Sequence, residues 1–183
     1  MESITKFIEK KLGLKVNVEK SKVARPNQIK YLGFGFYYTK TGIIKPKPHI
    51  KSIQKFKRKL KQLTKRSWSI SLDERIIKLN QVIRGWINYF KIGDMKRNLT
   101  NITSHLNRRL RCIIWKQWKT CKKRILALVK LGANIEQAKA ITFSRKSYWN
   151  TSLFISIYIT NKRLKKKGLV LPLDHYSKVH TVI

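Results

Sequence analysis

Apolar side chains recur every three or four residues along most of the stretch from residue 50 to residue 114. This period places them on one face of an α-helix. The stretch divides into three runs: Ile50, Ile53, Phe56, Leu60 and Leu63; then Ile76, Leu79, Ile83, Trp86, Ile87 and Phe90; then Leu99, Ile102, Leu106, Leu110, Ile113 and Ile114. Three amphipathic helices joined by short links predict a small helical bundle.

Local signals predict where these helices begin and end. Pro48 is expected to open the first helix. Ser71 followed by Glu74 has the spacing of a capping box at the start of the second, and Gly93 ends it. Asp73 and Glu74 could be metal ligands, but acidic residues are favoured electrostatically at a helix start. We interpret them as helix-start residues.

The N-terminal part has a different pattern. A helix over 3–11 is expected to end at Gly13. Over 14–19, apolar and polar residues alternate, which is typical of a strand. An aromatic strand over 29–38 and a short returning strand over 43–45 follow. Three strands are too few to close a sheet, so this part is expected to be one edge of something larger. The predicted fold class is mainly α, a helical bundle preceded by a small α+β part.

After Gly132 the predicted elements become shorter. We expect a helix over 135–141, a segment over 148–159 after a short link, and a basic cluster over 162–167. The last ten residues are expected to form a loose tail.

The charge of the chain predicts a polyanionic partner. It has 43 Lys and Arg against 8 Asp and Glu, a net charge of +35. Acidic residues are absent between Glu19 and Asp73 and again between Asp94 and Glu136. A polyanion whose counterions are released on binding relieves such repulsion, so RNA or DNA is the expected partner. The alternatives are a solvated cationic surface and binding to a membrane surface.

Several other classes of function lack support in the sequence. Cys112 and Cys121 lie nine residues apart on what reads as one helix, so no disulfide framework is expected. There is no Gly-rich phosphate loop, no obvious carboxylate pair and no His beside a Cys. We therefore expect no catalytic site, metal, cofactor or small-molecule substrate. No segment is apolar enough to span a membrane, so a cytoplasmic location is expected, with organelle import left open.

The aromatic residues fall into three groups. Trp86 and Phe90 lie on an apolar helix face and are expected in the core. Trp115 and Trp118 stand beside cations, where packing and base stacking are equally open. Tyr148 and Trp149 follow Arg145 and Lys146 after a loop, a composition that favours RNA contact.

Three blocks of the chain resemble a known family. The residues of 83–90, of 109–119 and of 144–149 look like the maturase-specific domain of group II intron reverse transcriptases and maturases. Upstream, residues 7–22 and 31–34 are similar to the last two sequence blocks of that family's polymerase palm.

This resemblance implies two domains: residues 1–45 as the C-terminal remnant of a palm, and residues 46–183 as the thumb and maturase-specific domain. In the family the Tyr-Ala-Asp-Asp box, whose aspartates bind Mg²⁺, precedes the helix that 3–11 resembles, so we expect no polymerase site in this chain. No cysteine and histidine endonuclease domain is expected after the maturase domain either.

The resemblance also implies partners and contact residues. The expected partner is group II intron RNA, with a primer–template or a separate palm polypeptide as further candidates. The residues expected to bind RNA are the cations Lys51, Lys55, Arg58, Lys59, Arg84, Arg108, Arg109, Arg111, Lys116, Lys119, Arg145 and Lys146 and the rings of Trp115, Trp118, Tyr148 and Trp149.

Three functional interpretations stay open at this point. The first is an RNA-binding fragment that assists intron folding and splicing. The second is the C-terminal piece of an RNA-directed DNA polymerase that works only with a palm supplied by another polypeptide. The third is an inert basic remnant that aggregates.

Overall fold

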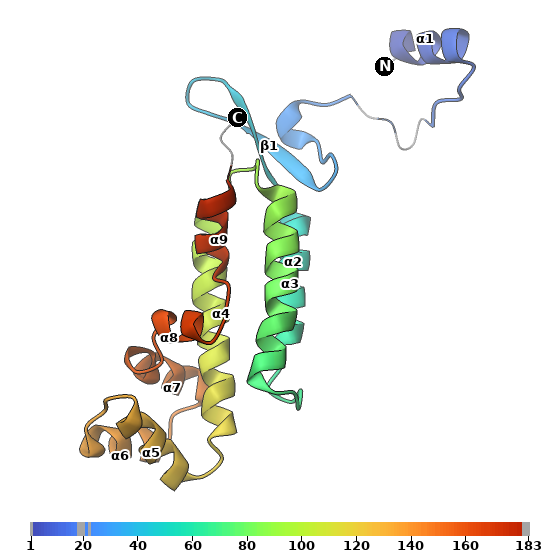
Figure 1. Cartoon of the computed structure of the whole chain (residues 1–183). Helices are drawn as coiled ribbons and strands as arrows, with labels where there is room; N and C mark the ends of the chain where they lie inside the picture. Colours follow the sequence, from blue (N-terminus) through green and yellow to red (C-terminus); the bar gives the residue numbers. More distant parts are fainter. Residues whose placement is uncertain (1, 18–20, 22, 181–183) are drawn as a thin grey trace.

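The computed structural model describes residues 2–17, 21 and 23–180, and most of them are helical (Figure 1). The N-terminal elements are α1 (Glu2–Leu12), the short 3₁₀ helix η1 (Pro26–Gln28), β1 (Phe34–Tyr38) and β2 (Ile44–Pro48). The long helices are α2 (Ile50–Leu63), α3 (Leu72–Phe90) and α4 (Lys96–Gln117). The C-terminal elements are α5 (Cys121–Lys130), α6 (Ile135–Phe143), α7 (Tyr148–Phe154), η2 (Ile155–Ile157), α8 (Asn161–Lys166) and α9 (Pro172–Val179).

The core lies between α2, α3, α4 and α9, which run side by side in Figure 1. The apolar runs predicted from the sequence supply it: Leu79, Ile83, Ile87, Leu99 and Leu110 are all fully buried. Phe90 is buried as predicted, and Trp86 packs against the core with its ring stacked on Phe56 at 4.3 Å. The prediction of a mainly helical bundle is confirmed.

Side-chain caps explain where α2 and α3 begin. The Oγ atom of Ser71 accepts a hydrogen bond from the Glu74 amide at 3.1 Å, as the capping-box spacing predicted. For α2 the prediction was wrong, because Pro48 ends β2 and His49 is the cap. The Nδ1 atom of His49 accepts from the Lys51 amide at 3.2 Å. Histidine is an uncommon N-cap residue, so the sequence predicted a helix start at Pro48 instead.

The two strands form an antiparallel hairpin that packs on the end of the bundle. Phe34 meets Phe90 edge to face at 4.8 Å. Tyr37 donates a hydrogen bond to Asp94 at 3.0 Å, and the Asp94 amide donates to the Pro46 carbonyl at 3.0 Å. A Cβ on Gly93 would lie 3.3 Å from the hairpin, so this glycine permits the close approach. The predicted domain boundary at 45/46 stays a prediction, and the chain crosses it inside β2.

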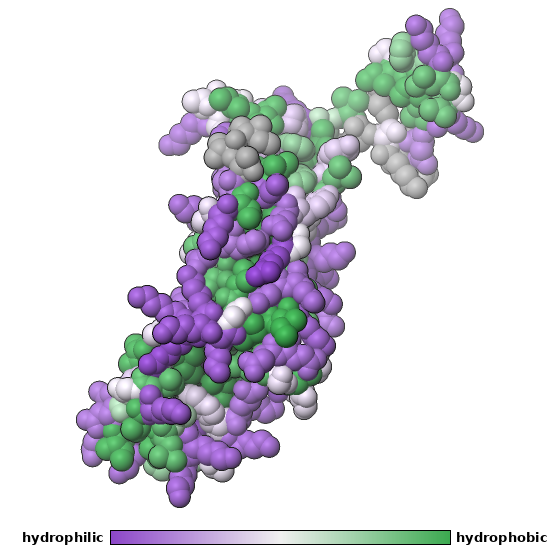
Figure 2. Space-filling model, viewed as in Figure 1, coloured by the Kyte–Doolittle hydropathy of each residue, from purple (hydrophilic) through white to green (hydrophobic). Residues whose placement is uncertain are grey.

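The described residues before the hairpin differ in part from the prediction. Helix α1 forms, but residues 14–17 have no strand structure, so the predicted strand over 14–19 is wrong there; Val18 and Glu19 lie outside the described residues. A segment in which apolar and polar residues alternate does not form a stable strand unless a neighbouring strand pairs with it. Helix α1 stands apart from the bundle, and its apolar face is visible in Figure 2. Ile4, Phe7 and Leu12 on α1 are each more than half exposed.

The C-terminal part corrects two further predictions. Helix α4 ends at Gln117 and α5 begins at Cys121, so Cys112 and Cys121 lie on different helices. Residues 174–180 are not a loose tail: Pro172 opens α9, and Tyr176 is buried with its hydroxyl donating to the Gly93 carbonyl at 3.1 Å. Residues 181–183 of the predicted tail lie outside the described residues. Eight residues are too few to show a clear helical period, so the pattern was not visible in the sequence.

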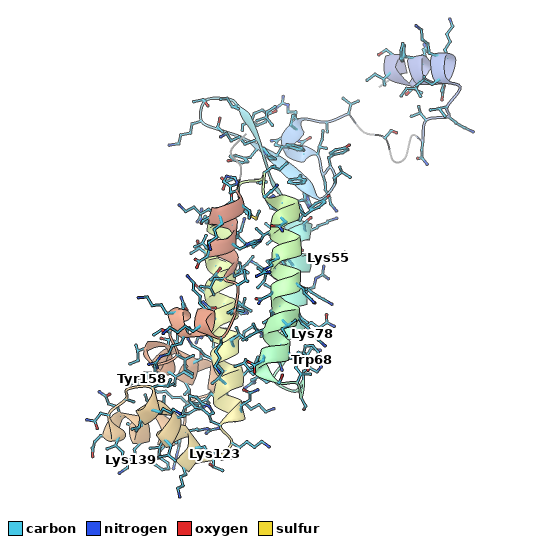
Figure 3. The ribbon with its side chains drawn as sticks, viewed as in Figure 1. Lys55, Trp68, Lys78, Lys123, Lys139 and Tyr158 are labelled. Atoms are coloured by element: carbon cyan, nitrogen blue, oxygen red, sulfur yellow. The ribbon has the colours of Figure 1, made fainter. Side chains whose placement is uncertain are left out.

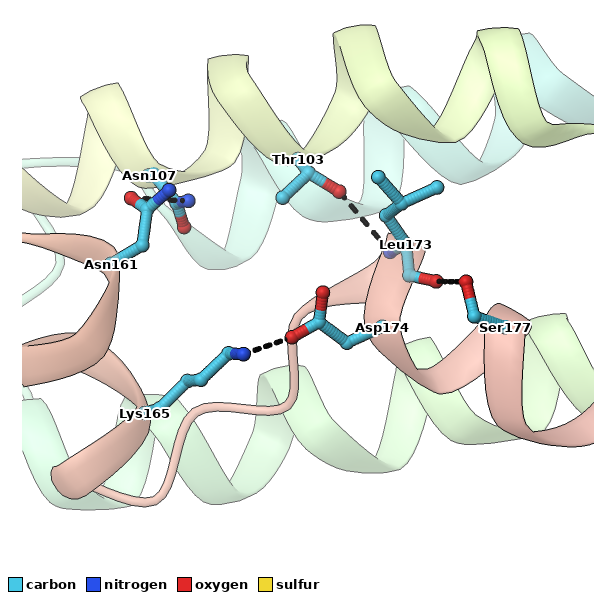
Figure 4. A network of polar contacts seen from close by, with 7 residues as sticks. All are labelled: Thr103, Asn107, Asn161, Lys165, Leu173, Asp174 and Ser177. Carbon is cyan, nitrogen blue, oxygen red and sulfur yellow. Dashed lines mark hydrogen bonds and ion pairs between the residues drawn. The ribbon is translucent and has the colours of Figure 1, made fainter.

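Polar contacts fasten α8 and α9 to α4 (Figure 4). The Thr103 hydroxyl accepts from the Leu173 amide at 3.3 Å, and Asn107 donates to Asn161 at 3.0 Å. Lys165 of α8 forms an ion pair with Asp174 of α9. No helix in the described parts of the chain has the length and apolar character needed to cross a bilayer.

Tyr176→Ala is expected to lower the free energy of unfolding by about 3–5 kcal/mol, because it removes a buried ring and its hydrogen bond. Lys178→Ala, an exposed change on the same helix, should alter it by less than about 0.5 kcal/mol. Urea denaturation followed by circular dichroism measures both. Equal stability of the two variants would show that α9 is not part of the core.

Candidate nucleic-acid interface

Two of the blocks that carry the family resemblance meet in space around α4. The basic stretch 108–119 contacts the loop between α2 and α3 on one side and the start of α7 on the other. The third block, 83–90, lies on α3 and supplies core residues. The predicted interface therefore has its centre on α4, where three arginines lie within four residues.

Arg108 holds the start of α7 against α4. Its Nη2 atom donates to the Trp149 carbonyl at 2.8 Å, and its Nε atom donates to the Ser152 hydroxyl at 3.2 Å. The guanidinium lies 3.9 Å from the centre of the Trp149 ring, a cation–π contact. The side chain expected to bind phosphate thus also orients a tryptophan expected to stack on a base.

Arg109 and Arg111 bind main-chain carbonyl groups. Arg109 donates to the carbonyl oxygens of Lys61 and Thr64 at 3.1 and 3.0 Å, at the C-terminal end of α2. Arg111 donates to the Ile159 carbonyl at 2.8 Å and to Asn161 at 2.9 Å. Partial burial lowers the pKa of both guanidinium groups, which stay charged at neutral pH. Both therefore join segments of the fold to α4.

Arg75 of α3, which was not among the predicted contact residues, also binds main-chain carbonyl groups. It is 1% exposed, donates to the Leu63 and Trp68 carbonyls at 2.5 and 2.7 Å, and lies over the Trp68 ring at 5.2 Å. Its burial lowers its pKa. One signal was available: Arg75 precedes Leu79 by four residues and Ile83 by eight, which places it on the apolar face of this helix.

The four predicted stacking rings differ in exposure. Trp115 is 4% exposed and belongs to the core, and Trp118 packs edge to face against it at 5.9 Å. Tyr148 is half-buried, with the Arg66 guanidinium 4.9 Å above its ring. Trp149 is 37% exposed, so it is the ring most accessible to a base.

The remaining predicted cations lie on two other surfaces. Lys51, Lys55, Arg58 and Lys59 are exposed on α2, and Figure 3 shows Lys55 projecting from the side of the bundle away from α7 and α8. Three of them border a groove between α2 and α3 whose floor includes Phe56, Trp86 and Phe90. Arg58 also lines a hollow between α2 and α4, so it joins the α4 group, whereas Lys51, Lys55 and Lys59 do not line that hollow.

The other predicted cations are also exposed. Arg84 is the one residue of the predicted RNA-binding set that lies on α3. Lys116 donates to the Arg66 carbonyl at 3.0 Å, and Lys119 lies beyond the end of α4. Arg145 and Lys146 precede α7, and Lys146 lies 3.9 Å above the Phe154 ring. The sixteen predicted residues therefore do not form one continuous site.

Three hollows adjoin on the surface of α4. One of about 790 Å³ lies between α4, α7 and α8, and one of about 400 Å³ lies between α2 and α4. The third, of about 820 Å³, lies between the 64–67 loop, α4 and α7. Each pair of hollows shares one residue, namely His105, Arg109 or Trp149. We call the surface formed by the three hollows the basic face.

The basic face carries no negative charge among the described residues that line it. Three acidic side chains have partners outside these hollows: Glu74 pairs with Lys78 at 2.9 Å, Asp94 accepts from Tyr37, and Asp174 pairs with Lys165. Within the described residues, no three His, Cys, Asp or Glu side chains gather in a way that could hold a metal ion. The arrangement suits a large anion.

A comparison with protein families matches the part of the chain that carries most of this surface. Residues 53–132 match the family model described as group II intron, maturase-specific domain. The chain contains a group II intron maturase-specific domain. Within the chain, this domain runs from α2 to the end of α5 and includes α4, whereas Trp149 and α8 lie beyond it. No curated protein matched the chain.

The maturase-specific domain carries a histidine whose pKa is lowered by burial and by neighbouring cations. Partial burial, then Arg109, Lys57, Arg108 and Lys61, lower the pKa of His105 from its ordinary value of about 6.5. His105 is therefore neutral at physiological pH. Its ring lies 5.3 Å from that of Trp149, where two hollows meet.

Arg109→Ala is expected to lower the free energy of unfolding by about 1–3 kcal/mol, because carbonyl groups at the end of α2 lose a charged donor. Arg58→Ala, which removes an exposed arginine from α2, should change it by less than about 0.5 kcal/mol. Urea denaturation of the two variants measures the difference. Similar decreases would mean that the carbonyl contacts of Arg109 contribute little.

Stability is expected to decrease as the pH falls below about 6.5. The folded state lowers the pKa of His105, so the unfolded chain binds more protons there and acid favours unfolding. His49 and His175 are shifted in the same direction. Melting temperatures measured from neutral to mildly acidic pH should fall less steeply for His105→Gln than for the native protein. Identical slopes would contradict the assignment.

Proposed function

We propose that this protein binds group II intron RNA through the basic face and helps the RNA reach its splicing-competent fold. The maturase-specific domain supports the intron as the partner. The observation that carries the proposal is the acid-free surface of three adjoining hollows around α4, bordered by cations and by one accessible indole ring. RNA is recognised through such combinations of phosphate contacts and stacking platforms.

The arginines of α4 and the surrounding exposed cations have different parts in this proposal. Arg109 and Arg111 keep the loop after α2 and the segment before α8 in place through carbonyl contacts. The exposed side chains of Arg58, Lys61 and Lys65 then contact phosphate from a fixed framework. Rigid placement reduces the entropy lost on binding, which favours structured RNA over a disordered polyanion.

The test is a titration of the purified chain with a group II intron RNA and with an unrelated structured RNA of equal length, at several salt concentrations. We expect tighter binding to the intron at every salt concentration. Arg58→Glu/Lys61→Glu/Lys65→Glu should weaken intron binding by at least about tenfold. The logarithm of the binding constant falls linearly with the logarithm of the salt concentration, and the variant should make this slope shallower by about one for each phosphate that it no longer neutralises.

The matched control reverses three exposed lysines away from the basic face, Lys40→Glu/Lys139→Glu/Lys178→Glu. It makes the same change in net charge, so it should leave the preference for the intron intact. Equal, steeply salt-dependent binding to both RNAs, or equally weakened binding by the two triple variants, would show a generic cationic surface and overturn the proposal.

A further inference from the structure

The hollow between α4, α7 and α8 combines features that neither a bare phosphate nor a double helix requires. Its volume of about 790 Å³ falls within the usual range of small-molecule sites. The lining contains an indole, an imidazole, three cations and several hydroxyl groups, with no acidic residue among the described residues that line it. Rings and cations in one concave site match a ligand with both a flat apolar part and a negative charge.

The flat surface at this site is already oriented. Arg108 lies 3.9 Å over the Trp149 ring and is held there by its bonds to the Trp149 carbonyl and the Ser152 hydroxyl. His105 approaches the same indole at 5.3 Å with its ring tilted by 53°. A base can stack on an indole or on a guanidinium plane, and here both planes lie together in one fixed unit.

Two further cations, Arg111 and Lys162, line the same hollow. Arg111 is anchored to the Ile159 carbonyl and to Asn161, so its guanidinium is fixed at the wall that α8 provides. Lys162, on the first turn of α8, lines the same wall and is exposed. The phosphate of a nucleotide whose base stacks on the ring would have these two cations within the same hollow.

We propose that this hollow holds one unpaired nucleotide of a bound RNA, with the base stacked on the Arg108–Trp149 pair and its phosphate beside Arg111 and Lys162. A paired base is covered on both faces by its neighbours in the helix, so only an unpaired nucleotide can enter. The proposal deepens the proposed function and rests on it for the source of the nucleotide. The site would recognise a loop, bulge or single strand rather than a duplex.

The experiment uses the full chain and a short single-stranded RNA that carries a fluorescent adenine analogue whose emission falls on stacking. The same strand annealed to its complement is the paired probe. Anisotropy gives the affinity, and emission intensity reports the stacking. We expect the native protein to quench the single strand and to leave the duplex signal unchanged.

Trp149→Leu keeps an apolar side chain and removes the indole. It should weaken binding of the single strand about 5- to 150-fold and abolish the quenching, with duplex affinity changed by less than about twofold. Phe143→Leu is the matched control, because Phe143 is an exposed aromatic residue on α6 that does not line the hollow. It should change neither affinity nor quenching.

Lys162→Gln gives a second measurement that keeps the test decisive if Trp149→Leu fails to fold. It should weaken binding of the single strand more than binding of the duplex, whereas Lys139→Gln, an exposed change on α6, should affect both equally and slightly. Equally weakened binding of the two probes, or quenching that persists without the indole, would overturn the nucleotide site.

The two proposals fail separately. If quenching depends on Trp149 but the chain shows no preference for the intron, the site stands and the proposed function falls. If the preference for the intron is present and Trp149→Leu leaves single-strand binding unchanged, the proposed function stands and the nucleotide site falls.

Discussion

Guanidinium groups that donate to main-chain carbonyl oxygens connect the peripheral segments of this protein to its central helices. Arg75 and Arg109 both bind the C-terminal end of α2 and the loop that follows it. Arg111 binds the segment before α8, and Arg163 binds the Leu131 and Tyr158 carbonyls. The last carbonyls of a helix have no partner within the helix, so a buried donor there satisfies groups that would otherwise destabilise the fold.

Arginines that bind carbonyl groups keep the positive charge of the molecule. A carbonyl partner stabilises a guanidinium without cancelling its charge, so the packing of the chain leaves its excess of +35 intact. Ion pairs such as Lys78–Glu74 and Lys165–Asp174 lie away from the basic face. These arginines thus join segments around the apolar core and still leave a strong positive field for a polyanion.

The proposed RNA site extends beyond the residues that match the maturase-specific domain. The matched part supplies α2, α3, α4 and α5, and hence the arginines and most of the basic face. Trp149 at the start of α7 and Lys162 on α8 come from later in the chain, and Tyr176 of α9 closes the core beside Gly93. The C-terminal helices therefore complete both the core and the surface that the matched domain begins.

The sequence by itself determined the three long helices, the cap at Ser71, the core positions of Trp86 and Phe90, and the positive charge of the chain, because each depends on local period or on composition. Only the tertiary structure decided which arginines turn inward, that His49 caps α2, that residues 14–17 do not form a strand, and that α9 packs on the bundle. The reason is that every residue carries a carbonyl group. No sequence signal marks which of them will end a helix beside an arginine from a distant segment.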